Sequence, residues 1–138
     1  MRWWVVLLGM VAAEAGAQTS WFTVASDPAR ADVDTVQVDP VAIRAGSGQK
    51  TMNVRVNRAG ERRNWEQLPY RSYQSRVVFD CRAGKASYVR ASFYAMPLWQ
   101  GEPYHHSNYG DSPRPMLLLD MAPNPTQRLI RAACRSDA

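Results

Sequence analysis

The amino-acid sequence predicts an α+β domain: an antiparallel β-sheet of about five to six strands with a C-terminal helix packed on it, and one disulfide. Three observations indicate this fold class. Apolar and polar residues alternate in several segments between residues 21 and 94, as in half-buried strands. A helix-start pattern begins at Pro123. The chain has two cysteines, Cys81 and Cys134, and the second closes the predicted helix.

The start of the chain has the three parts of a secretory signal peptide. Arg2 precedes an apolar run from Trp3 to Ala13, and an Ala-x-Ala pattern follows. The run is too short to span a membrane, which takes about 20 residues. We therefore expect residues 1–17 to be a cleaved signal peptide, with a buried N-terminal element as the alternative. Residues 18–138 would form a single exported domain, in the periplasm or at the outer cell surface, with no transmembrane segment.

Five segments have the residue types or the alternation of a β-strand. They are residues 21–25, 35–39, 51–57, 70–81 and 86–95. In the fourth segment, alternation places Tyr73 and Phe79 on one face. In the fifth, it places Val89 and Phe93 on one face and Tyr88 on the other.

The segments between these strands are rich in residues that favour turns. We expect a helical turn at residues 40–43, a turn at 45–49, a loop at 58–69 and a hairpin turn at 82–85. Residues 96–115 contain four prolines and two glycines, which predicts a long loop. Residues 116–121 are apolar enough for a last strand.

The C-terminal segment has the pattern of a capped helix. Asn124 is a suitable N-cap, Pro125 suits the first helical position, and Gln127 completes a capping box. Leu129 and Ile130, with Ala133, then form one apolar face. We expect this face to pack on the sheet.

The redox state of the compartment decides whether the two cysteines form a disulfide. Export would place Cys81 and Cys134 in an oxidising environment, where disulfides persist. Two cysteines with none left over form one bridge, so we expect a Cys81–Cys134 disulfide. In the chain-entropy model a bridge closing a loop of this length is worth roughly 4 kcal/mol. The alternatives are a nucleophile paired with a histidine, a metal ligand or a buried free thiol.

The chain is basic, with a net charge of +5. Its charges stand singly or in pairs between apolar residues, as on a solvated surface. An exported basic protein would attract anionic partners such as lipopolysaccharide, sulfated glycans or acidic protein surfaces, and we do not expect nucleic acid. The sequence has no glycine-rich phosphate loop and no Gly-x-Ser-x-Gly motif, so we expect no cofactor and no catalytic residue.

Trp65 is flanked by four arginines in a predicted strand and the loop after it. They are Arg55, Arg58, Arg62 and Arg63. An anionic ligand would dock there through salt bridges and stacking. The alternative is a charged sheet edge that prevents strands from pairing between molecules.

A second group of candidate binding residues lies in the predicted long loop and is aromatic: Trp99, Tyr104 and Tyr109. These side chains either form a contact surface or pin the loop onto the sheet. The same loop contains His105 and His106, a weak alternative metal site. Adjacent histidines in a strand-like segment point opposite ways and rarely share one ion, so we expect no metal there.

The order of several motifs resembles the surface-adhesin protein E family of Gram-negative bacteria. The motifs are Trp21, "VQVDPVAIRAGSG", "MNVRV", "YRSYQSRVVFDC", Phe93-Tyr94 and the helix that closes on Cys134. The resemblance implies a small antiparallel sheet, a packed C-terminal helix, the Cys81–Cys134 bridge and an exported location. It also implies binding to host extracellular proteins such as vitronectin, laminin and plasminogen.

We therefore expect an exported, non-enzymatic binding protein with an extracellular or envelope macromolecule as its ligand. A protein or an anionic glycan would be the partner, and exposed strand edges leave a homodimer open. The alternative is a periplasmic envelope accessory protein or inhibitor with no host-binding role. A second alternative is a small metal-dependent enzyme that uses the His105–His106 loop.

Overall fold

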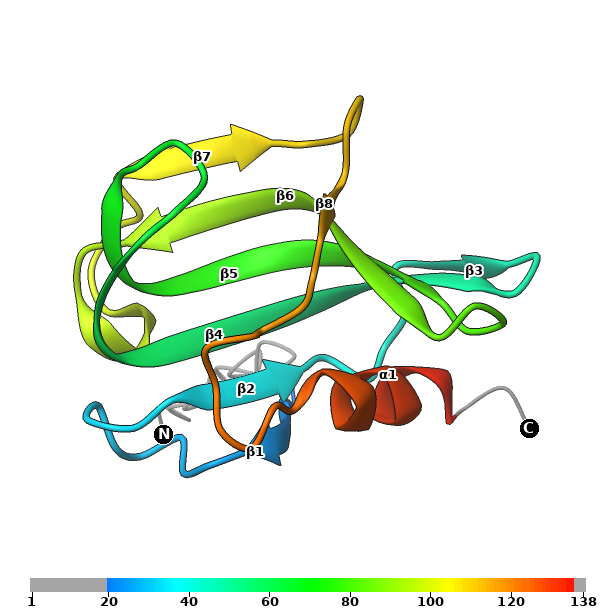
Figure 1. The fold of residues 1–138 in the computed structure, drawn as a ribbon, viewed down its shortest axis with the longest axis horizontal. Coiled ribbons are helices and arrows are strands. Elements are labelled where there is room, and N and C mark those ends of the chain that lie inside the picture. Colours follow the sequence, from blue (N-terminus) through cyan, green and yellow to red (C-terminus); the bar gives the residue numbers. More distant parts are fainter. Residues whose placement is uncertain (1–19, 136–138) are drawn as a thin grey trace, which may run out of the picture.

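The computed structural model describes residues 20–135, and a single antiparallel sheet organises this part of the chain (Figure 1). The main strand order is β1-β2-β4-β5-β6-β7, with β3 paired to β4 and β8 paired to β6. The strands are β1 (Phe22–Ala25), β2 (Thr35–Val38), β3 (Arg44–Gly46), β4 (Gln49–Arg63), β5 (Pro69–Asp80), β6 (Lys85–Tyr94), β7 (His105–Asn108) and β8 (Arg114–Pro115). They are followed by one α-helix, α1 (Thr126–Cys134).

The predicted fold class is confirmed, with more strands than the five to six expected. The additional strands β3, β7 and β8 lie in segments that the sequence assigns to a turn or a loop. Two expected elements are wrong: residues 40–43 form no helical turn, and residues 116–121 form no strand. The predicted signal peptide lies outside the described residues. Within residues 20–135, no helix has the length and apolar character needed to cross a membrane.

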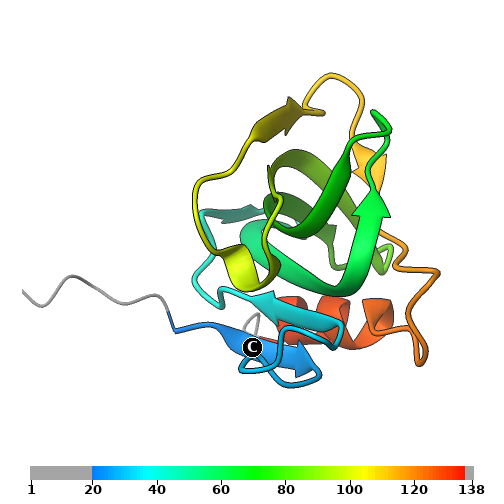
Figure 2. The ribbon, with the colours of Figure 1, turned by 90° about the vertical axis from the view of Figure 1, so that its left-hand side faces the viewer.

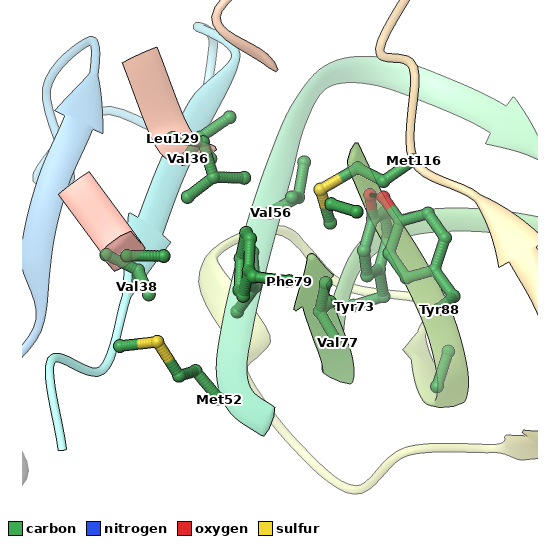
Figure 3. Packing of buried hydrophobic residues seen from close by; sticks show 14 of the residues in the cluster. Val36, Val38, Met52, Val56, Tyr73, Val77, Phe79, Tyr88, Met116 and Leu129 are labelled. Carbon is green, nitrogen blue, oxygen red and sulfur yellow. Dashed lines mark hydrogen bonds between the residues drawn. The ribbon is translucent and has the colours of Figure 1, made fainter. Parts of the chain in front are cut away.

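The sheet is strongly curled, so that β1, β2 and α1 lie below β4 to β7 in Figures 1 and 2. The register aligns apolar residues of neighbouring strands into rows on the inner face of this curl. One row runs through Val36, Val56, Tyr73 and Phe93. Figure 3 shows side chains of such rows meeting Leu129 of α1. This inner face is the core of the domain.

Strand β6 changes face at a bulge, which corrects one prediction. Arg76 pairs with Arg90, but the next residue, Val77, pairs with Tyr88, so Val89 is the extra residue. A bulge shifts the two-residue alternation by one position. Tyr88 therefore lies in the core with Phe93, whereas regular alternation predicts that it faces the other way.

Strand β4 continues to Arg63, through part of the predicted loop at residues 58–69. Its pairing with β5 shifts between Asn57 and Arg62. A short turn then closes the hairpin, in which the Asn64 side chain accepts a hydrogen bond from the backbone N–H of Leu68 at 2.8 Å. The β4 strand of this long hairpin carries Arg58, Arg62 and Arg63.

Helix α1 packs its apolar face on the inner side of the sheet. Leu129, Ile130 and Ala133 are buried, as predicted. The helix begins one residue later than expected, with Pro125 at the N-cap and no side-chain capping bond, so the capping box with Gln127 does not form. Asn124 instead accepts a hydrogen bond from the Thr126 N–H at 2.9 Å.

The predicted Cys81–Cys134 disulfide is confirmed. It joins the end of α1 to the residue that follows β5, and a second contact supports it. The buried Lys50 ammonium donates a hydrogen bond to the Ala133 carbonyl at 3.2 Å, at the helix C-terminus. A cation stabilises this end of a helix because the last carbonyl groups carry partial negative charge.

Candidate binding cleft

An open cleft of about 640 Å³ lies between the β4–β5 turn and the chain that follows β8. Buried aromatic side chains form its floor: Tyr70, Tyr73, Tyr88 and Phe93. Arginines from the end of β4 lie on one side, and residues 117–120 lie on another. The cleft combines a large apolar surface with cationic groups.

The aromatic floor is tightly packed and neutral. Neighbouring rings have centroids 5.2–5.8 Å apart in tilted or edge-to-face arrangements, which aromatic pairs prefer. The Tyr73 and Tyr88 hydroxyl groups share a hydrogen bond. Burial raises the pKa of both tyrosines, so neither ionises near neutral pH. Figure 3 shows Met116 next to these two hydroxyl groups, at the point where the chain after β8 crosses the floor.

Arg58 is the buried member of the arginine group. Its guanidinium donates to Asp120 at 2.7 Å and to Asp34 at 3.1 Å, while Arg62 lies 3.2 Å from Asp120. Burial alone would lower the pKa of Arg58, but these two carboxylates raise it above its ordinary value. Arg58 therefore ties the chain after β8 to β4, and Arg62 pairs with the Asp120 carboxylate from the surface.

The Asp120–Arg58 pair predicts a dependence of stability on pH. Burial raises the pKa of Asp120, but Arg58 outweighs this and holds it below the ordinary value. Stabilisation is complete above the unfolded-state pKa of about 3.9 and is lost as the pH falls from there through the lower folded-state pKa. Because Asp120 is 44% exposed, we expect Asp120→Asn to cost less than about 1 kcal/mol at pH 7. Thermal unfolding between pH 7 and 3 should show a smaller acid-induced loss in the variant; parallel curves would contradict this.

Trp65 lies over the edge of the aromatic floor. Its ring contacts Tyr88 and Tyr109 edge-to-face, with centroids 5.7 and 5.6 Å away, yet the side chain remains 46% exposed. Next to it, the buried Nδ2 of Asn64 has no hydrogen-bond partner among residues 20–135. A buried donor without an acceptor is unfavourable. The cleft thus offers an exposed indole, beside which a buried donor lacks an acceptor among the described residues.

Of the three leucines that follow β8, Leu117 and Leu119 are exposed, whereas Leu118 is partly buried against the core. Leu117 is 50% exposed and Leu119 is 78% exposed. The Leu117 carbonyl accepts hydrogen bonds from the Asn124 and Thr126 side chains, both at 2.8 Å. Met116 is buried and donates its N–H to Ala86 at 2.9 Å. Apolar side chains therefore remain exposed to solvent at the border of the cleft.

Arg55 lies away from the other predicted arginines, on the outer face of the sheet. Its guanidinium is stacked between the rings of Trp21 and Trp99, at 4.4 and 3.9 Å from their centroids. It also donates to the Gln37 side chain at 2.7 Å. The structure therefore brings together Arg58, Arg62, Arg63 and Trp65 in the cleft, but not Arg55.

Trp99 pins the chain between β6 and β7 onto the sheet. It ends a short 3₁₀ turn (Pro97–Trp99), and its indole N–H donates to the carbonyls of Val56 and Tyr73, at 3.2 and 2.9 Å. The backbone N–H of Trp99 donates to Ser72 at 3.0 Å. Of the two roles that the sequence leaves open for this aromatic group, these contacts support the pinning role for Trp99.

We expect Trp99→Phe to lower the free energy of unfolding by about 1–3 kcal/mol, because two partly buried carbonyl groups lose their shared donor. The ring would still cover Arg55. Trp65→Phe is the matched control, since no indole hydrogen bond of Trp65 occurs among the described residues. Urea denaturation should show a clearly smaller loss for the control. Equal losses would mean that ring size, and not the hydrogen bonds, determines the effect.

The two tyrosines of the same predicted group also contact the β4–β5 hairpin. The Tyr104 hydroxyl donates to the carbonyl of Pro69, although the side chain is 46% exposed. Tyr109 is buried, and its hydroxyl lies 3.1 Å from both carboxylate oxygens of Glu66. The Tyr109 ring packs against Trp65, which lines the cleft, and so supports the cleft indirectly. Neither tyrosine lines the cleft itself.

His105 and His106 lie on β7 and have different surroundings. The His105 ring packs near Phe93, with centroids 6.2 Å apart, whereas Nδ1 of His106 lies 2.7 Å from the Ser92 hydroxyl. Within residues 20–135, no three His, Cys, Asp or Glu side chains come together as metal ligands would. The weak metal alternative thus gains no support from this geometry.

Sequence reasoning missed several residues of the cleft. Asn64, Leu117, Leu119 and Asp120 were not predicted, and neither was the tyrosine floor. A signal existed for the leucines, because the apolar run Leu117–Leu119 precedes Asp120 without the alternation of a strand. The pairing of Asp120 with Arg58 joins residues 62 positions apart and has no local signal.

Comparisons with known proteins give one result. The family model described as surface-adhesin protein E matches residues 21–135, which is most of the chain. No curated protein and no solved structure matches. The match covers every strand and the helix, from β1 to the cysteine that closes α1. The chain therefore belongs to the surface-adhesin protein E family.

Proposed function

We propose that this protein is an exported, non-catalytic binding protein that holds an extended segment of a partner protein in the cleft. The observation that carries the proposal is the combination of exposed Leu119 and Trp65 with the cationic side chains of Arg62 and Arg63 around one aromatic floor. Tryptophan, tyrosine and arginine dominate the energetics of protein interfaces. Membership of an adhesin family agrees with this role.

The charges of the cleft indicate what the bound segment contains. Three arginines line it, and two carboxylates pair with them: Asp34 with Arg58, and Asp120 with Arg58 and Arg62, which leaves a net positive charge. A segment with an acidic residue next to a bulky apolar residue would pair with the guanidinium groups and fill the space between Leu119 and Trp65. Such binding would remove exposed apolar surface at the cleft.

The binding test uses vitronectin and laminin, which the family resemblance suggests as partners. We expect Trp65→Ala with Leu119→Ser to weaken binding of the purified protein to one of them at least tenfold, since truncating an interface hot spot costs about 2 kcal/mol or more. Val41→Ser is the matched control, because Val41 is 73% exposed and does not line the cleft. Biolayer interferometry would measure both. Equal affinities for the two variants would overturn the proposal.

Localisation separates this proposal from a periplasmic accessory or inhibitor protein. We expect an antibody against the folded domain to label intact cells. Labelling only after permeabilisation of the outer membrane would favour the periplasmic role and exclude adhesion.

The enzyme alternative has little support, because Cys81 is in a disulfide and the two histidine side chains have different neighbours. A His105→Ala, His106→Ala variant should leave binding unchanged.

A further inference from the structure

The outer face of the sheet carries a row of polar side chains that the proposed function does not use. The register aligns Asn53 of β4, Arg76 of β5, Arg90 of β6 and Asn108 of β7 as successive cross-strand neighbours. In the neighbouring row, Gln74 of β5 pairs with Ser92 of β6, and Ser92 pairs with His106 of β7. These two rows contain amide, hydroxyl and cationic side chains, and no carboxylate.

Arg76 and Arg90 are directly opposite each other at the centre of this surface. Cross-strand neighbours have Cβ atoms about 5 Å apart, and two like charges in this arrangement repel. No carboxylate among residues 20–135 forms an ion pair with either guanidinium. The Nε atom of Arg76 is buried and has no hydrogen-bond partner in the described part of the chain. Within residues 20–135 the pair therefore has no counter-charge, and Arg76 Nε has no acceptor.

A small depression of about 170 Å³ lies over this pair. Arg76 and Arg90 line it with the side chains of Asn53, Gln74 and Ser92. Since one water molecule takes up about 30 Å³, the space holds a tetrahedral oxyanion with some water. Guanidinium groups bind such anions through two parallel hydrogen bonds.

We propose that the Arg76–Arg90 depression binds a sulfate ester of a sulfated polysaccharide. The two guanidinium groups neutralise the sulfate. The surrounding amides and Ser92 hydrogen-bond to the hydroxyl groups of the neighbouring sugars. A lipid is the less suitable ligand, because no exposed apolar side chain borders the depression to receive an acyl chain. This site is separate from the cleft and does not depend on it.

The test measures binding of a heparin hexasaccharide and of its desulfated counterpart by isothermal titration calorimetry at 150 mM salt. We expect the sulfated form alone to bind. Arg76→Gln with Arg90→Gln should weaken binding at least about tenfold, because hydrogen bonds to charged groups are worth roughly 1.5–3 kcal/mol each. Arg90→Gln alone should weaken it less; Arg90 is exposed, so this variant will fold.

The matched control is Arg128→Gln with Arg131→Gln, which removes the same charge from two exposed positions on α1. Equal weakening in both double variants would show that net charge alone attracts the glycan, and would overturn the site. Binding of lipopolysaccharide vesicles without binding of the hexasaccharide would overturn the choice of ligand. The cleft variant Trp65→Ala, Leu119→Ser should bind the hexasaccharide normally, so failure of the cleft and failure of this site are distinguishable.

Discussion

Replacing both cysteines by serine, Cys81→Ser with Cys134→Ser, is expected to lower the free energy of unfolding by about 4 kcal/mol. The bridge spans 53 positions and excludes many conformations of the unfolded chain. Domains of this size are stable by about 5–15 kcal/mol, so the loss would be a large share of the total. Denaturation in urea would measure it.

The same variant should also loosen one end of α1. The disulfide and the Lys50–Ala133 hydrogen bond together hold this end on the sheet. We therefore expect amide hydrogen exchange to increase most in the last turn of the helix, and less in the centre of β5. A loss below about 1 kcal/mol, with unchanged exchange in α1, would show that packing alone holds the helix.

Phe79→Ala is expected to destabilise the domain by about 3–5 kcal/mol. Phe79 is fully buried on the inner face of β5, where Figure 3 shows it among Val77, Val56 and Val38. Removing the ring leaves a cavity that a curled sheet closed by a disulfide cannot easily fill. Denaturation in urea, with the wild-type protein measured in parallel, would give the difference.

Val78→Ala is the matched control for this experiment. Val78 is adjacent in β5 but is only partly buried, on the outer face. We expect a loss of about 1 kcal/mol or less, as for a partly exposed side chain. Similar losses for the two variants would contradict the assignment of the inner and outer faces of β5.

Alternation predicted the inner face of the sheet well where the pairing is regular. Val54 and Val56 of β4, and Val77 and Phe79 of β5, lie in the core as their period of two requires. The alternation pattern failed at Tyr88 because β6 contains a bulge. The bulge depends on how β6 pairs with β5, and no local sequence pattern indicates this pairing. The short strands β7 and β8 were missed because the segment around them, residues 96–115, contains four prolines and two glycines, as loops do.

The candidate site was predicted in part. Arg58, Arg62 and Trp65 do meet, because one hairpin carries them. Arg55 was grouped with them by its proximity in sequence, yet it is three positions from Arg58, and an odd separation places two strand residues on opposite faces. The leucine border of the cleft comes from the segment just before Asp120, which is 62 positions from Arg58 in the sequence and is held there by the Arg58–Asp120 pair.

The two faces of the sheet have different chemistry. The inner face ends in an aromatic cleft with exposed leucines, which suits a protein segment. The outer face presents a cationic pair among amides and hydroxyls, which suits a sulfated sugar. The disulfide and the packing of α1 on β1, β2, β4 and β5 favour a rigid sheet before any partner arrives. Such preorganisation lowers the entropy that binding would cost.

Photo-crosslinking from the cleft tests its binding role most directly. A photoreactive phenylalanine analogue would be placed at Leu119, and in a second protein at Val41, before each is mixed with laminin or vitronectin and irradiated. We expect a covalent product from position 119, reduced by Trp65→Ala, and none from position 41. Equal products from both positions, or a product from position 41 alone, would contradict a binding role for the cleft.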